Sequence, residues 1–371
     1  MSGKRDSNIE LLRIITMILI IGHHYVHHGL YASMLTGSAT NLWINGGGIA
    51  RAIASLLYPG GRVGNYIFFM LSGYFLINRT ESIKLRKVIS IVIFYGITLS
   101  LVSGLLGLMG ILPEGVRFSS IIKNSIIGLF TPITGVWWFI TAYILLMLLV
   151  PIINGYISKL TLKGYFAFLV FLWLPFAVID YMFNSPLIEI EMAVYFYMLG
   201  GFLRKSNLAK KHRFLIWAIL SVIAWCCSAG LNYIANAGVD DNLALKAIVK
   251  FSTGLDAGIV SLLAACFIFC TFASLRMPYI SWINRMAEST LAVYMIHEFP
   301  TIRYFLWNNI FKVAAAYQKM LFPLYAAMSI GVVFLGCIVI DQIRAYLAKR
   351  YGEIIHNKMK EFAIKEKVFA R

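Results

Sequence analysis

The sequence predicts an all-α integral membrane protein, a polytopic helix bundle with about ten transmembrane helices. Hydrophobic residues make up 60% of the chain and charged residues only 13%, with a mean hydropathy of +0.78. Soluble globular proteins carry far more charge. In addition, apolar stretches recur along the whole chain at lengths near 20 residues, which is enough to cross the hydrocarbon core of a bilayer.

The apolar stretches define the expected elements in order. They cover residues 9–29, 63–79, 88–111, 136–155, 164–180, 188–203, 214–235, 252–275, 287–306 and 321–343. The first is too long for a cleavable signal peptide and has no small-residue cleavage site after it. We therefore expect one transmembrane domain over residues 1–345, followed by a basic cytoplasmic tail over residues 346–371.

The distribution of basic residues predicts the orientation. With the N-terminus inside, the Lys and Arg residues that lie outside the first span divide into 23 on the inner side and 9 on the outer side. This bias is typical of cytoplasmic loops. We expect a multi-pass protein of the inner (plasma) membrane with both termini in the cytoplasm. Topology and attraction to anionic membrane lipids then explain the net charge of +17, and no nucleic-acid partner is expected.

Two polar residues on the first span carry the strongest functional signal. Arg13 and His24 are eleven residues apart, which on a helix brings them within about 20° of one face and about 16 Å apart along the axis. Such residues are costly in hydrocarbon and usually have a function there. The neighbouring His23, His27 and His28 are expected to mark the membrane interface. Spacing would also allow His24 and His28 to share a metal ion, but without a third ligand we expect no metal.

A second intramembrane site lies on the ninth span. His297 and Glu298 fall about ten residues from its inner end, at a depth that His24 can share, and Tyr294 lies one turn before them. A polar cluster built by two helices is therefore allowed. Either Glu298 or Glu10 could orient a histidine, and the sequence leaves that choice open.

Basic residues also gather in the first inner loop, at Arg79, Lys84, Arg86 and Lys87. They can be ordinary cytoplasmic charge, or together they can bind the phosphates of an anionic cofactor, because Arg forms paired charge-assisted bonds to phosphate. Both interpretations stay open at this point.

Five segments in order resemble the membrane-bound acyltransferase family 3 proteins. They are NIELLRIITMILIIGHHY with Arg13-x10-His24, FFMLSGYFL, the basic loop after it, GVWWFITAYILLMLLVPIIN and STLAVYMIHE. The resemblance implies O-acylation, usually O-acetylation, of a cell-surface or lipid-linked glycan with cytoplasmic acyl-CoA, most often acetyl-CoA, as donor. It also implies that His24 is catalytic and that the basic loop holds the donor, although Lys84-Leu85-Arg86-Lys87 does not match the family's RxxR motif.

The chemistry of acyl transfer agrees with these residues. A thioester is already activated, so transfer to a hydroxyl needs a base, a donor for the developing oxyanion and exclusion of water. His24 suits the base, and Arg13 the charged end of the donor. The main alternative is a transporter or exporter of a polysaccharide precursor or small solute, which would explain intramembrane His and Glu equally well. It predicts internal repeats, and none is visible in the sequence.

Overall fold

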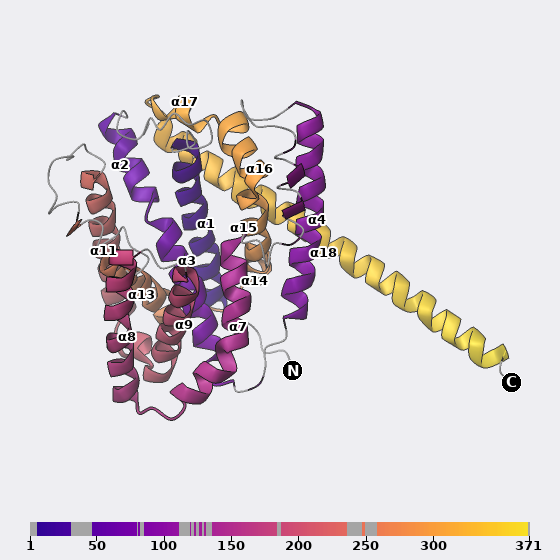
Figure 1. Cartoon of the computed structure of the whole chain (residues 1–371), viewed down its shortest axis with the longest axis horizontal. Helices are drawn as coiled ribbons and strands as arrows, with labels where there is room; N and C mark the ends of the chain where they lie inside the picture. The colour runs from indigo at the N-terminus through magenta and orange to yellow at the C-terminus, as the bar shows by residue number, and fades with distance from the viewer. Residues whose placement is uncertain are drawn as a thin grey trace.

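The computed structural model describes residues 6–30, 47–79, 81, 85–110, 119, 122–123, 126–127, 130, 136–183, 187–235, 247–248 and 258–369. Every regular element in these ranges is helical, and none is a strand. The helices stand side by side in a bundle, with α1 (Ser7–Leu30) near its centre (Figure 1). The predicted all-α membrane bundle is therefore confirmed.

The other elements follow along the chain. They are α2 (Gly48–Leu57), α3 (Gly60–Leu76), α4 (Arg86–Leu108), α7 (Trp138–Ile157), α8 (Leu162–Phe183), α9 (Ile188–Ser206), α10 (Leu208–Lys211), α11 (Phe214–Ala235), α13 (Ile259–Ser274), α14 (Ser281–Ala287), α15 (Thr290–Glu298), α16 (Pro300–Tyr304), a π-helical turn (Phe305–Ile310), α17 (Val313–Tyr317) and α18 (Phe322–Phe369). Among the described residues, five helices are long and apolar enough to cross a membrane, namely α1, α4, α7, α11 and α18. The predicted number of ten spans is not established by this criterion.

The ninth predicted span is wrong as a single helix. Residues 287–306 were expected to form one continuous helix. In the structure α15 ends at Glu298 and Pro300 begins α16, with Phe299 between them in an extended conformation (φ −62°, ψ 129°). Proline has no N–H for the helical ladder and forces the residue before it away from helical geometry. His297 and Glu298 consequently lie beside a break in the helix rather than in the middle of a continuous helix.

Helix α18 is longer than the tenth predicted span. It continues without interruption from Phe322 to Phe369, past the end of the expected span at residue 343. Its C-terminal half projects from the bundle (Figure 1). No proline follows Pro323, and the tail is rich in Ala, Lys, Glu and Ile. Most of these residues favour helix, so the segment expected as a basic tail is helical.

Helices α3 and α9 pack backbone against backbone. A Cβ atom at Gly73 of α3 would overlap the carbonyl group of Tyr197, and one at Gly200 of α9 would overlap the carbonyl group of Met70. Small residues at such crossings let membrane helices approach closely. Helix α3 in turn packs along α1. These glycines therefore set the position of the central helices.

The close approach predicts that Gly200→Ala destabilises the protein, because the opposing atoms belong to the backbone of α3 and cannot move away cheaply. We expect a cost of about 1–3 kcal/mol in the free energy of unfolding, seen as a lower melting temperature in detergent. Gly155→Ala in α7 is the matched control, since a Cβ there meets no atom within 4 Å. Equal melting temperatures of the two variants would contradict the packing argument.

Candidate functional site

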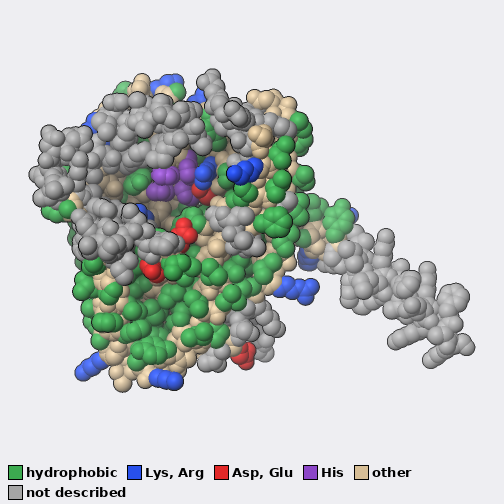
Figure 2. All heavy atoms as spheres, in the orientation of Figure 1, with side chains coloured by type: hydrophobic (Ala, Val, Ile, Leu, Met, Phe, Trp, Pro, Cys, Tyr) green, Lys and Arg blue, Asp and Glu red, His purple; other side chains and the backbone are tan. Residues whose placement is uncertain are grey.

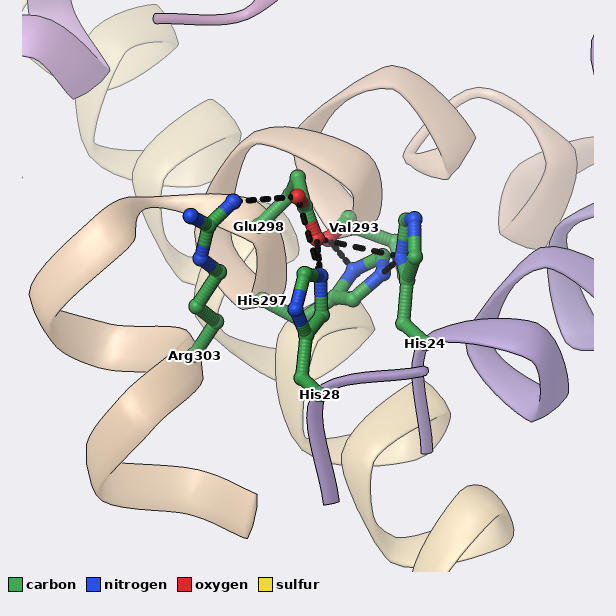
Figure 3. Close-up of polar contacts among 6 residues, drawn as sticks. All are labelled: His24, His28, Val293, His297, Glu298 and Arg303. Atoms are coloured by element: carbon green, nitrogen blue, oxygen red, sulfur yellow. Dashed lines mark hydrogen bonds and ion pairs between the residues drawn. The ribbon is translucent and has the colours of Figure 1, made fainter. Parts of the chain in front are cut away.

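Residues from two distant parts of the chain meet around one carboxylate (Figure 3). The Oε2 atom of Glu298 lies 3.2 Å from Nδ1 of His24 and 3.1 Å from Nε2 of His28. Its Oε1 atom accepts a 2.8 Å bond from Nη1 of Arg303. Nε2 of His297 lies 2.9 Å from Nδ1 of His24. We call these five residues the His/Glu cluster.

The cluster is buried but accessible from one side. His297 is fully buried and Glu298 is 6% exposed, whereas the side chains of His24 and His28 are 13% and 17% exposed. Figure 2 shows histidine side chains in a hollow of the surface, next to basic and acidic side chains. A buried carboxylate is tolerated only when cations and hydrogen-bond donors surround it. Here α1 supplies the rings of His24 and His28, and α16 supplies the Arg303 guanidinium.

The contacts assign the nitrogen that carries the proton on each neutral ring. Nδ1 of His297 donates a 2.5 Å bond to the carbonyl oxygen of Val293, so Nε2 of His297 is an acceptor. Nδ1 of His24 faces that acceptor and the Glu298 carboxylate, and therefore carries a hydrogen itself. Nε2 of His24 is then the unprotonated nitrogen. By the same argument Nε2 of His28, which faces the Glu298 carboxylate, carries a hydrogen. The cluster thus holds two imidazoles, His24 and His28, whose basic nitrogens lie outside these contacts.

Arg13 does not join the cluster. It lines a cavity of about 160 Å³ together with Phe139, Tyr143 and Tyr294, among others, and we call this the Arg13 cavity. The ring of Tyr294 stands between the two sites, with its centroid 6.3 Å from that of His297. Oε2 of Glu10 lies 3.7 Å from Nη1 of Arg13, so Glu10 belongs with Arg13. Of the two acids that the sequence left open, it is Glu298 that contacts His24.

The basic residues predicted to bind the cofactor are only partly brought together. Arg86 and Lys87 line a cleft of about 1080 Å³, here called the α4 cleft, which Arg285, Arg344 and Lys349 also line. Arg79 lies three residues after the end of α3 and does not line that cleft. Lys84 lies outside the described residues. Val88 and Thr290 line the Arg13 cavity, and their neighbours Lys87 and Ser289 line the α4 cleft, so α4 and the start of α15 contribute to both spaces.

A second basic cleft lies near the start of α1. It has a volume of about 1010 Å³ and we call it the α10 cleft. Its basic lining residues are Arg204, Lys210, Lys211, Arg213 and Arg276, with Asp6 as an acidic neighbour. Sequence analysis treated these residues as ordinary cytoplasmic charge. The structure therefore offers two places where phosphates could bind.

Two members of the cluster were missed by sequence reasoning. His28 was expected to mark the interface, but it contacts Glu298. Its position one helical turn after His24 was the available signal. Arg303 was counted only as a basic residue of the outer side. Its signal was Pro300, which turns the chain so that Arg303 can reach back to Glu298.

Comparison with known proteins decides the family. A family model described as an acyltransferase domain matches residues 6–341, nearly the whole chain. The chain belongs to acyltransferase family 3. It is therefore a membrane acyltransferase, as the resemblance implied. No curated protein and no solved structure gives a significant match.

In this acyltransferase the ion pair between Glu298 and Arg303 should contribute to stability. Glu298→Gln and Arg303→Gln should each lower the free energy of unfolding, and the double variant should lose less than the sum of the two. We expect a coupling energy of about 1 kcal/mol, because the Arg303 side chain is 33% exposed and solvent weakens the pair. Unfolding in mixed detergent would measure it. Strict additivity would mean that the pair is not formed.

Proposed function

We propose that this acyltransferase transfers an acyl group, most often acetyl, from cytoplasmic acyl-CoA to a hydroxyl of a cell-surface or lipid-linked glycan. The enzyme would act in the inner (plasma) membrane with both termini in the cytoplasm, where the basic residues concentrate. The observation that carries the proposal is the His24 imidazole, held by Glu298 and His297 with Nε2 left as its basic atom.

His24 acts as the general base in this proposal. Nε2 takes the proton of the acceptor hydroxyl while its oxygen attacks the thioester carbonyl. The C–O bond forms, the C–S bond breaks, and the proton passes from His24 to the leaving thiolate, giving free CoA. Glu298 accepts the Nδ1 hydrogen of His24 and stabilises the imidazolium that exists between these proton transfers.

The donor would enter from the cytoplasm through the α4 cleft. Arg86 and Lys87 line the α4 cleft, where their charges suit the phosphates of acyl-CoA. The Arg13 cavity, to which α4 and the start of α15 also contribute, extends to Tyr294, beside His297. Arg13 would bind polar groups of the donor along this route, while the acceptor would reach His24 from the hollow seen in Figure 2.

Replacing His24 with Ala tests the base directly. We expect turnover to fall by roughly 10²–10⁴, as is usual when a positioned base is lost, while the protein still inserts and folds. His27→Ala is the matched control, because it removes a histidine from the same helix that is not a member of the His/Glu cluster. The measurements are acceptor-dependent release of free CoA and mass spectrometry of surface glycans. Near-normal turnover in His24→Ala would refute the assignment.

Substitutions at Arg13 test its role in donor binding. Arg13→Ala should abolish most activity, and Arg13→Lys should restore only part of it, because Lys keeps the charge but lacks the planar guanidinium that forms paired bonds. The change should appear mainly as a higher KM for acyl-CoA. Equal, full activity in both variants would remove Arg13 from the mechanism.

A comparison of the two basic clefts tests where the donor's phosphates bind. Neutralising Arg86 and Lys87 to Gln should raise the KM for acyl-CoA about tenfold or more, since two charge-assisted contacts are lost. Lys210→Gln with Lys211→Gln in the α10 cleft removes the same charge and should leave that KM unchanged. Topology must be verified in both, because loss of inner charge can invert a span. The reverse result would move the donor to the α10 cleft.

A further inference from the structure

Four potential metal-ligand atoms converge in the His/Glu cluster. They are Nδ1 of His24, Nε2 of His28, Nε2 of His297 and Oε2 of Glu298. The contacts between them measure 2.9, 3.2 and 3.1 Å. Around a tetrahedral zinc ion with bonds of about 2.0–2.1 Å, neighbouring ligand atoms stand roughly 3.3 Å apart. These three contacts would need to lengthen by only a few tenths of an ångström to fit around such an ion.

The groups behind these atoms also fit a metal site. Ligating histidines usually donate their other ring N–H to a carbonyl or carboxylate oxygen, which fixes the ring. His297 does so through Nδ1 to the Val293 carbonyl. The second oxygen of Glu298 is held by Arg303, which leaves Oε2 directed at the histidines. His24, His297 and Glu298 can each offer one ligand atom within 4.8 Å of the others.

We propose that the His/Glu cluster is also a binding site for one divalent transition-metal ion, with Zn²⁺ as the ion whose preferred ligands it matches. Two histidines and a glutamate are a common zinc-ligand set, which His24, His297 and Glu298 provide. His28, which contacts Glu298, would move toward them to supply the fourth position. The sequence suggested only His24 and His28 for such an ion. The other two ligands, His297 and Glu298, come from α15, which lies about 270 residues later in the chain.

Zinc binding should inhibit acyl transfer, a consequence that rests on the proposed function. The ion takes the Nδ1 lone pair of His24, so the neutral ring must keep its remaining hydrogen on Nε2. That nitrogen then cannot accept the hydroxyl proton. The ion also withdraws Glu298 from its contact with the Nδ1 hydrogen. The metal-bound protein is thus an inhibited form, and chelation restores the base.

The metal site can be tested by direct binding. The full chain is purified in detergent, stripped with a chelator and titrated with Zn²⁺, and bound zinc per chain is measured after equilibrium dialysis. We expect one ion per chain, with affinity at least about tenfold weaker in His297→Gln and in Glu298→Gln. His27→Gln is the control, because it removes a histidine outside the four-ligand set and should bind zinc normally. His28→Gln provides a third test variant if either of the first two fails to fold.

The results separate the metal site from the proposed reaction. Absence of stoichiometric zinc, or equal affinity in all variants, would overturn the metal site and leave the His24 mechanism untouched. Zinc binding with inhibition that a chelator reverses would support both proposals. Zinc binding with full activity of the loaded protein would establish the metal site but refute His24 as the base.

Discussion

The central constraint on this structure is the burial of the Glu298 carboxylate. A charge in the interior of a membrane protein is stable only if partners reach it, and these partners come from both ends of the sequence. His24 and His28 approach from α1, while Arg303 approaches from the other side of the Pro300 break. The contacts tie the first helix to the segment that follows α15. The break in the ninth segment is therefore part of the site, because an unbroken helix would direct Arg303 elsewhere.

Under the proposed function, one helix carries two chemical tasks at separate positions. Arg13 faces a cavity near the N-terminal half of α1, and His24 belongs to a cluster in the C-terminal half. Tyr294 stands between them. An enzyme that joins a water-soluble cytoplasmic donor to an acceptor at the other face needs such an arrangement, because neither substrate then has to cross the bilayer. Helix α3 packs backbone to backbone against α9 and also lies along α1, and these contacts keep α1 in place.

Sequence reasoning reached the fold class, and it allowed His24 to meet His297 and Glu298, which they do. Helical spacing was enough to place Arg13 and His24 on one stripe and to allow His24 and His297 a common depth, since both depend only on the rise per residue. The choice of Glu298 over Glu10 depended on packing between helices far apart in sequence, which periodicity does not specify. Pro300 was visible in the sequence, but the average hydropathy of a long apolar segment does not reveal that a single proline interrupts the helix. Gly60 and Gly61 begin α3 and pack against Leu19 and His23 of α1, a contact that hydropathy does not reveal either.

The distance between Arg13 and His24 has a consequence for donor selection under the proposed mechanism. A rigid helix fixes the two side chains about 16 Å apart along its axis. A donor whose polar groups bind Arg13 must therefore carry its acyl group on an arm that extends a comparable length beyond them. Short activated acyl compounds, such as acyl phosphates or simple thioesters, cannot span this interval while bound. The first helix would thus act as a molecular ruler that selects donors by length as well as by charge.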